Sequence, residues 1–301
     1  MELSLRNVAT HVIYGRDVLV KRDDLVTFGP RINGNKYRKL LHIVKDTAGE
    51  PIVSFGPYQS NSMAALASVC KMQGRKFVYY SLPVPPDELR TPVANLKFAL
   101  EAGMELRQVE REGNPLFLYD LTADEVTDLS SFHMVPLSVA YKQAEEGCRQ
   151  LARELVEQLE EYSFTKVKVA CSSYSGALAM FIERYFRERA PHISAVAVPC
   201  SGDGTRTREE MEALDKKTGN LEMIPEVLYR KRGWFLTAAP IDEGVFKRYR
   251  MEEKLHVREE LMHQGLPVDF LFGAGAWEVM KTRTDFFKDN GFALVYYHYW
   301  R

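Results

Sequence analysis

Apolar positions along this chain alternate between short continuous runs and longer stretches in which they recur at helical spacing. The short runs predict strands at residues 17–21, 51–55, 76–82, 104–109, 166–171, 193–198 and 292–299, and the run at 268–272 starts a further unit. The longer stretches predict helices at residues 36–47, 61–73, 91–102, 137–162 and 176–189. Because strands and helices alternate, the predicted fold class is α/β, with mostly parallel sheets covered by helices on both faces.

Composition narrows the class of protein. The chain has 301 residues, of which 46% are hydrophobic and 27% charged, as in a soluble protein with a substantial core. This length fits one large α/β domain or two smaller ones. The net charge of −1 provides no overall field that would favour a nucleic-acid or membrane partner.

Targeting signals and metal motifs are not found in the sequence. The first residues contain no apolar segment typical of a secretory signal, and no apolar run reaches the roughly 20 residues that span a bilayer. We therefore expect a cytoplasmic protein without a membrane partner. The four cysteines show no metal-binding spacing, so we expect buried thiols and no metal site.

Lys36 is the strongest candidate for chemistry. It lies in the run NGNKYRKL at 33–40, after a Gly-Asn turn and at the start of a predicted helix. A lysine that attacks an aldehyde must lose its proton, and a helix N-terminus with nearby Arg38 and Lys39 disfavours the ammonium form. A solvated surface lysine is the alternative. The eight-residue run and two later segments favour cofactor attachment.

The run KRDDL at 21–25, followed by GNKYRKL, resembles the pyridoxal-phosphate (PLP) enzymes of fold type II. The resemblance is to the branch that holds 1-aminocyclopropane-1-carboxylate (ACC) deaminase and D-cysteine desulfhydrase. It implies that Lys36 carries the cofactor as a Schiff base, with Asn35 beside it. It also implies a tryptophan synthase β-like architecture, with the cofactor in a cleft between two domains, and a homodimer. The large PLP-binding domain would comprise residues 1–48 and 158–301, and the small α/β domain 49–157.

A second candidate segment, GPYQSNS at 56–62, lies between a predicted strand and a predicted helix. Ser60 is a natural N-cap, and the helix start offers backbone N–H groups that can hold a substrate carboxylate. The resemblance implies that Asn61 contacts the phenolic oxygen of the cofactor, and that Ser60 has a catalytic role. It also implies that Ser60 and Ser62 face the substrate, and the predicted substrate-binding residues are Gln59, Ser60, Asn61 and Ser62. The alternative is an ordinary capped helix without a ligand.

A third segment, VACSSYSGA at 169–177, has the strand–loop–helix order of a phosphate-binding loop. It occupies the place of the glycine-rich loop of the family, but several glycines are replaced by bulkier residues that limit close approach of the backbone. A simple turn between strand and helix is an equal interpretation. The predicted cofactor-binding residues here are Ser172, Ser173, Tyr174, Ser175 and Gly176.

The fourth segment, at 269–277, departs from the family pattern at two positions. Phe272 replaces a tyrosine that lies near the cofactor ring, so it can stack but cannot transfer a proton. Gly273 replaces a residue that can pair with the ring nitrogen, and that partner stays unassigned. These changes argue against ACC as the substrate. Near the end of the chain, the aromatic run at 295–301 is interpreted as a structural strand, with His298 near the cofactor as the alternative.

The sequence therefore predicts a PLP-dependent lyase or deaminase that acts on a small-molecule amino acid. Lys36 would move the Cα proton, and β-elimination or deamination would follow. One alternative is a PLP-dependent decarboxylase or lyase acting on an amino acid carried by a larger substrate, such as a modified nucleotide or nucleic-acid base. Basic residues at 230–232 and 247–248 would then line the entrance. The other alternative is a non-catalytic relative that binds PLP or an amino acid.

Overall fold

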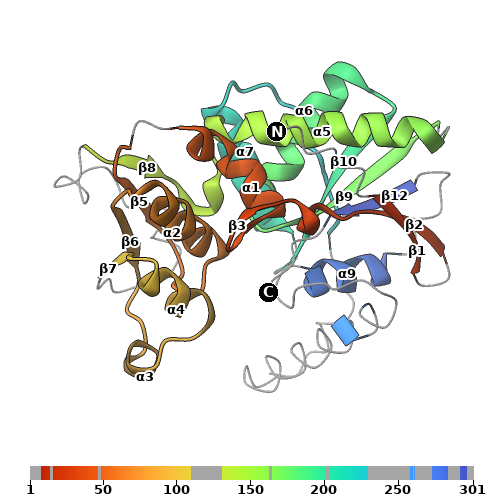
Figure 1. Ribbon diagram of the computed structural model, residues 1–301. Helices are drawn as coiled ribbons and strands as arrows, with labels where there is room; N and C mark the ends of the chain where they lie inside the picture. Colours follow the sequence, from red (N-terminus) through yellow and green to blue (C-terminus); the bar gives the residue numbers. More distant parts are fainter. Residues whose placement is uncertain are drawn as a thin grey trace. The chain divides into compact units, whose positions relative to one another are not determined.

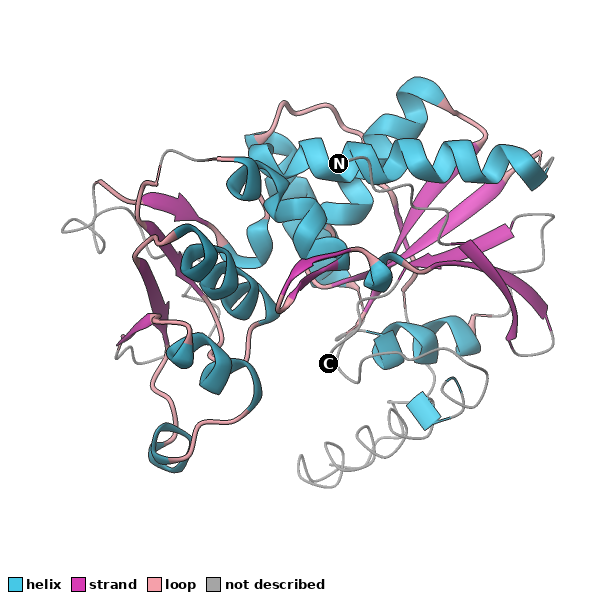
Figure 2. Cartoon of the chain, viewed as in Figure 1, coloured by secondary structure: helices cyan, strands magenta, loops and turns pink. Residues whose placement is uncertain are grey.

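The chain forms two compact units, each with its own parallel sheet (Figures 1 and 2). The first unit comprises residues 1–26 and 148–301, and the second comprises residues 27–147. The computed structural model describes residues 8–13, 16–46, 49–109, 131–162, 165–200, 204–229, 258–259, 261, 273–283 and 292–296.

The first unit is built on the strand order β11-β10-β9-β12, with every neighbouring pair parallel. These strands are β9 (Val167–Ser173), β10 (Ile193–Pro199), β11 (Glu226–Val227) and β12 (Phe292–Tyr296). Helix α6 (Ala177–Arg189) packs on one side of this sheet and α9 (Gly273–Thr282) on the other (Figure 1). The central strands are buried on both faces, as their continuous apolar runs predict.

The remaining elements of the first unit flank this sheet. They are the antiparallel strands β1 (Val8–Ile13) and β2 (Arg16–Lys21), a 3₁₀ turn at Asp23–Leu25, helix α5 (Glu145–Leu159), which crosses the boundary between the units, a 3₁₀ turn at Glu160–Tyr162, and helix α7 (Thr205–Lys217). Lys21 is fully buried in β2, and its Nζ donates to Glu154 of α5 at 3.2 Å and to Gln158 at 3.1 Å. These bonds tie α5 to β2.

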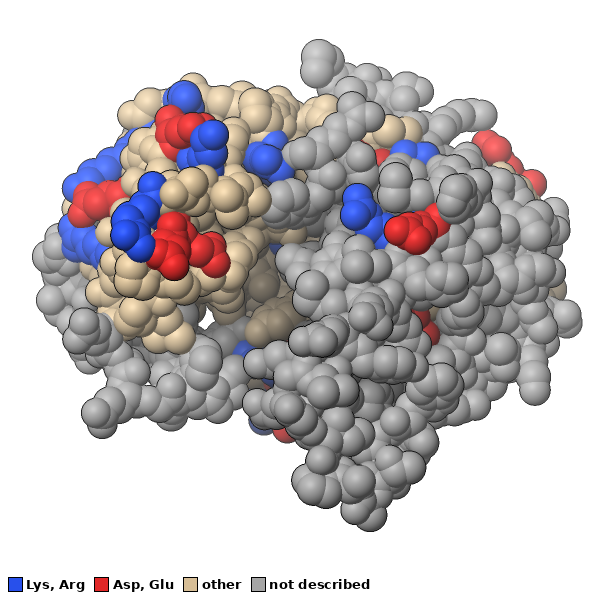
Figure 3. Space-filling model, turned by 90° about the horizontal axis from the view of Figure 1, so that it is seen from below, with Lys and Arg blue, Asp and Glu red and all other residues tan. Residues whose placement is uncertain are grey.

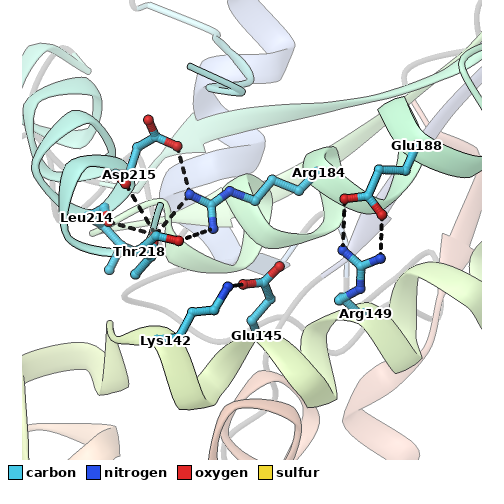
Figure 4. Close-up of polar contacts among 8 residues, drawn as sticks. All are labelled: Lys142, Glu145, Arg149, Arg184, Glu188, Leu214, Asp215 and Thr218. Carbon is cyan, nitrogen blue, oxygen red and sulfur yellow. Dashed lines mark hydrogen bonds and ion pairs between the residues drawn. The ribbon is translucent and has the colours of Figure 1, made fainter. Parts of the chain in front are cut away.

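Polar contacts, one of them buried, also hold α6 to its neighbouring helices (Figure 4). The guanidinium of Arg184 has no exposed area, and it donates to the Asp215 carboxylate at 2.7 Å and to the Thr218 hydroxyl at 2.8 Å. Arg149 of α5 pairs with Glu188 of α6. Arg184 is therefore a fully desolvated cation whose charge is balanced by α7.

The second unit is built on the strand order β7-β6-β5-β8, again parallel throughout. Its strands are β5 (Ile52–Phe55), β6 (Phe77–Ser81), β7 (Glu105–Gln108) and β8 (His133–Val135), with a small antiparallel pair, β3 (Thr27–Gly29) and β4 (Ile32–Asn33). Its helices are α1 (Gly34–Lys45), α2 (Asn61–Gln73), α3 (Pro86–Arg90) and α4 (Ala94–Glu101), with 3₁₀ turns at Leu137–Val139 and Lys142–Ala144.

The bounds of the two units differ from the expected domains. Residues 27–48 were expected with the large domain, but they group with the second unit, where they form β3, β4 and α1. The second unit ends at residue 147, inside the first turn of α5. As a consequence, Lys36 and the Ser60–Asn61 segment belong to one compact unit.

Most predicted elements are confirmed, and two predicted helices are wrong over part of their length. Helix α2 has the predicted bounds, because Ser60 caps its start and Gly74 ends it in the left-handed conformation. The predicted helix at 137–162 instead begins as two 3₁₀ turns, and α5 starts only at residue 145. Ser138 and Val139 have positive φ, and Tyr141 is extended, which interrupts the helix. The predicted helix at 91–102 starts later, as α4.

Charges of both signs are interspersed on the surface. Figure 3 shows blue and red side chains side by side over the described residues of the face that it presents. Exposed ion pairs such as Arg90 with Asp87 and Lys97 with Glu101 have the same mixed character. The basic residues at 230–232 and 247–248 lie outside the described residues.

Candidate functional site

Lys36 lies in the first turn of α1, and its side chain is only 6% exposed. The far end of α1 is held by α2 and the turn after it. Gln73 donates to the carbonyl oxygens of Ile43 (3.0 Å) and Asp46 (3.2 Å), and Arg75 pairs with the Asp46 carboxylate at 2.9 Å. These contacts fix the helix that carries Lys36 to α2, within one unit.

The middle of α1 is in close contact with Gly147, the last residue of the same unit, which lies in the first turn of α5. A Cβ atom placed on Gly147 would lie 1.9 Å from the carbonyl oxygen of Arg38, which is far inside van der Waals contact. No side chain fits there, so this glycine allows the two helices to approach closely. The contact lies two residues after Lys36.

Asn35 provides a test of whether a ligand fits beside Lys36. Its side-chain Oδ1 is buried and has no hydrogen-bond partner among the described residues. Buried polar atoms in folded proteins are normally paired, and an unpaired one calls for an explanation, such as a catalytic role or a bound water or ion. The atom is one residue from a buried amine, in the position expected for a cofactor-binding residue.

The start of α2 is capped by the side chain that the sequence predicted. The Ser60 hydroxyl accepts hydrogen bonds from the backbone N–H groups of Ser62 at 3.1 Å and Met63 at 3.3 Å. The same hydroxyl hydrogen-bonds to the phenol of Tyr79, which itself donates to the Pro57 carbonyl at 3.1 Å. Burial raises the pKa of Tyr79, and the Ser60 hydrogen bond opposes that shift. Ser60 is thus a structural cap as well as a site candidate.

Asn61, the first residue of α2, is 8% exposed and contacts a residue that the sequence analysis did not select. Asn95 of α4 donates from its Nδ2 to the Asn61 Oδ1 at 2.9 Å. The same Nδ2 donates to the backbone carbonyl of Gln59 at 3.0 Å. The sequence gives little indication of a role for Asn95, because an asparagine in the first turn of a helix is usually exposed. Its burial depends on how α4 packs against α2.

A cluster of His42, Tyr141 and His133 lies at the other end of α1. The Nε2 atoms of both histidines contact the Tyr141 hydroxyl, that of His133 at 3.3 Å. Burial lowers the pKa of His42 to about 4, with the nearby His133 acting in the same direction; the Lys39 carbonyl, Glu146 and Asp46 oppose it. His42 is therefore neutral in the folded protein near neutral pH.

The turn between β9 and α6 is shorter than the sequence predicted. Ser172 and Ser173 belong to β9, where they pair with Val198 and Pro199 of β10. Tyr174, Ser175 and Gly176 remain in the turn. Ser173 is buried and donates from its hydroxyl to the Cys171 carbonyl at 2.9 Å, so this hydroxyl is directed to its own strand.

The N-terminal part of α7 supports this turn. Thr207 donates to the backbone carbonyl of Tyr174 at 3.0 Å, and the Arg206 guanidinium lies 5.2 Å from the centre of the Tyr174 ring. Gly176 caps α6 with φ of 69°, and a Cβ atom there would lie 2.3 Å from Met211. Glycine is thus required at the position where the predicted phosphate loop enters the helix.

The second unit therefore brings together one group of predicted site residues: Asn35, Lys36, Gln59, Ser60, Asn61 and Ser62. The first unit holds the other group, Ser172 to Gly176. In the second unit, a buried lysine, an amide in the first turn of α2 and an unpaired amide oxygen are groups of the kind that bind an aldehyde and a phenol. In the first unit, the N-terminus of α6 is a group of the kind that binds a phosphate. The residues of each unit, taken separately, fit PLP. Phe272 and His298 lie outside the described residues.

Solved structures with the same fold include several enzymes. An ACC deaminase homologue matches with a TM-score of 0.68 and 19% identity, covering 94% of this chain and 84% of its own. A threonine deaminase from the organism abbreviated T.th. matches with a TM-score of 0.63 and 12% identity, covering 95% and 90%. A hydrogen sulfide-producing enzyme, Fn1055 of Fusobacterium nucleatum, matches with a TM-score of 0.61 and 13% identity, covering 97% and 84%.

These similarities confirm the predicted fold class, the two-domain α/β architecture of the fold type II PLP enzymes. No protein-family model matches the chain, and no curated protein matches it. Among the described residues, no helix is both long and apolar enough to cross a membrane. In the same part of the chain, no three His, Cys, Asp or Glu side chains are grouped so that they could hold a metal ion.

Proposed function

We propose that this protein is a PLP-dependent lyase or deaminase that acts on a small amino acid, with Lys36 as the residue that holds the cofactor. The observation that carries the proposal is the burial of Lys36 in the first turn of α1, beside the unpaired Oδ1 of Asn35. The fold supports it, since the structures that share it include a threonine deaminase and, from Escherichia coli, a diaminopropionate ammonia lyase.

Bound PLP would accept the electrons released when a bond to the amino acid Cα is broken. The residues of the chain would do the rest. Lys36 would hold the cofactor and then, once displaced by the substrate amine, carry the Cα proton. Asn61 would donate to the phenolic oxygen of the cofactor. The N-terminus of α2, with Ser60, Ser62 and Gln59, would bind the substrate carboxylate.

The turn between β9 and α6 would bind the phosphate of the cofactor. Gly176 precedes α6 in a left-handed conformation, and because it has no side chain, no cap side chain accepts from the first N–H groups of the helix, which are the groups that would bind an anion. Ser175 and Tyr174 would add side-chain contacts. We infer weaker binding there than a glycine-rich loop gives, because Ser172 and Ser173 continue β9.

The experiment that tests the function uses the purified full-length protein with PLP, followed by borohydride reduction and peptide mapping. We expect the cofactor to be fixed on Lys36. We also expect release of ammonia and a 2-oxo acid from at least one member of a panel of D- and L-amino acids. Lys36→Ala should abolish both, and Lys45→Ala is the matched control, because Lys45 lies on the same helix and is exposed. Full covalent labelling in Lys36→Ala would refute the assignment.

A second candidate function is a non-catalytic protein that binds PLP or an amino acid. The shortened turn after β9 favours it, since fewer backbone N–H groups are available to a phosphate. Covalent labelling of Lys36 without turnover of any amino acid would support this candidate. A catalytic rate that depends on Lys36 would exclude it.

We further propose that the protein is a cytoplasmic homodimer, as the resemblance to fold type II enzymes implies. The four cysteines are buried and form no disulfide, which suits a reducing compartment. Light scattering after size-exclusion chromatography would measure the mass of the assembly. A mass of one chain at all concentrations would contradict the dimer.

A further inference from the structure

Asn95 is a buried amide that has no role in the proposed chemistry. It is the second residue of α4, only 2% of it is exposed, and its side chain reaches the segment that precedes α2. Its Nδ2 donates both to the Gln59 carbonyl at 3.0 Å and to the Asn61 Oδ1 at 2.9 Å. An amide nitrogen has two protons, so both of them are used here.

The backbone carbonyl of Gln59 determines which way the Asn95 amide faces. A carbonyl oxygen can only accept, so Asn95 must direct its nitrogen and not its oxygen at Gln59. The same nitrogen also faces Asn61, which must therefore turn its own oxygen toward Asn95. The Asn61 Nδ2, a hydrogen-bond donor, is then on the side of the Asn61 amide that faces away from Asn95. The orientation passes from a fixed backbone atom through Asn95 to Asn61.

Two further observations show that this arrangement is maintained at a cost. The Oδ1 of Asn95 is buried without a hydrogen-bond partner among the described residues, which is unfavourable. The preceding residue, Ala94, has φ of 50°, in the left-handed region that alanine seldom adopts. Backbone strain of this kind is concentrated at functional sites.

We propose that Asn95 is a positioning residue, which fixes the Asn61 amide so that its nitrogen, and not its oxygen, is presented to the cofactor. This inference rests on the proposed function. A donor stabilises the phenolic oxygen of PLP, whereas an amide oxygen turned the same way would repel it. Asn95 itself contacts neither cofactor nor substrate in this proposal.

The test compares PLP affinity and the pH titration of the visible absorbance band in four proteins. Asn95→Asp keeps the size of the side chain but cannot donate, so it should allow Asn61 to turn over. Asn95→Leu removes both donors. Asn220→Asp, at an exposed position of the other unit, is the matched control for the same chemical change. We expect about tenfold to a hundredfold weaker PLP binding in both Asn95 variants, with a shifted pH midpoint, and no change in the control.

A double-mutant cycle with Asn61→Ala separates positioning from general damage to the fold. If Asn95 acts through Asn61, adding Asn95→Leu to Asn61→Ala should weaken PLP binding by less than about threefold. Full additivity, or Asn95 variants that bind PLP like the unaltered protein, would overturn the inference and leave the proposed function intact. If the unaltered protein does not attach PLP to Lys36, the proposed function and this inference both fail. Should Asn95→Asp not fold, the comparison of Asn95→Leu with the unaltered protein and the control decides the test.

Discussion

His42 should make the protein lose stability as the pH falls below neutral. The imidazole is neutral in the folded state because its pKa is lowered to about 4, whereas in the unfolded chain it is about 6.5. Between these values the unfolded state binds a proton that the folded state does not. The stabilisation is therefore complete above about pH 6.5 and is lost progressively toward about pH 4.

The magnitude follows from the shift. A difference of about 2.5 pKa units corresponds to at most about 3 kcal/mol, and about 1–2 kcal/mol remains once solvent screening of a partly buried group is included. The assay is urea unfolding, followed by circular dichroism, at about pH 7.5 and about pH 4.5. His42→Gln removes the titrating group, so its unfolding free energy should fall less between these conditions.

The control for this experiment is His192→Gln, because His192 is an exposed histidine in the other unit. It should retain the pH dependence of the unaltered protein. Parallel pH profiles for the unaltered protein and His42→Gln would refute the reasoning. They would show that His42 takes up its proton as easily in the folded protein as in the unfolded chain.

Two further predictions concern packing and buried charge. Gly147→Ala should destabilise the protein by about 1–3 kcal/mol, because the new methyl group would overlap the Arg38 carbonyl. This loss is expected even though alanine favours helices more than glycine does. Thermal unfolding measures the change, and Arg153→Ala, on the exposed face of α5, is the control. A stable Gly147→Ala protein would contradict the close contact between Gly147 and the Arg38 carbonyl. Asp215→Ala should cost about 3–5 kcal/mol, since it leaves the buried Arg184 cation without its carboxylate. The double variant Asp215→Ala with Arg184→Met should recover much of that stability in the same measurement. A double variant that is as unstable as Asp215→Ala alone, or less stable, would contradict this prediction.

Local sequence was sufficient for those parts of the fold that depend on neighbouring residues. The bounds of α2 follow from a capping serine and a terminal glycine, both of which act within one helical turn. The start of α5 was not predictable, because the apolar spacing continues through residues 137–144 while Ser138 and Val139 adopt left-handed conformations. Helix α7 was also missed, since its sequence is mostly charged and only a few of its residues are buried.

In the candidate site, too, the residues that belong to local motifs could be predicted and those that depend on distant contacts could not. Lys36 and Ser60 were identified because each lies in a continuous motif at the start of a helix. Asn95 was not identified, because its role depends on a contact with Asn61 over 34 positions of the chain. Similarly, the local sequence does not show whether Ser172 lies in a loop or in a strand. Its pairing with Val198 of β10 places it in the strand.

The cap formed by Ser60 has a consequence for any anion that binds at the start of α2. Its hydroxyl already accepts from the N–H groups of Ser62 and Met63, so a carboxylate that uses them must first displace it. The Ser60 hydroxyl would therefore compete with such a carboxylate for these two N–H groups, and its displacement would oppose binding by about 1 kcal/mol. An anion held there by charge alone would gain little, whereas an amino acid anchored at its nitrogen could meet that cost. The helix N-terminus would in this way discriminate against simple anions before any side chain makes contact with the substrate.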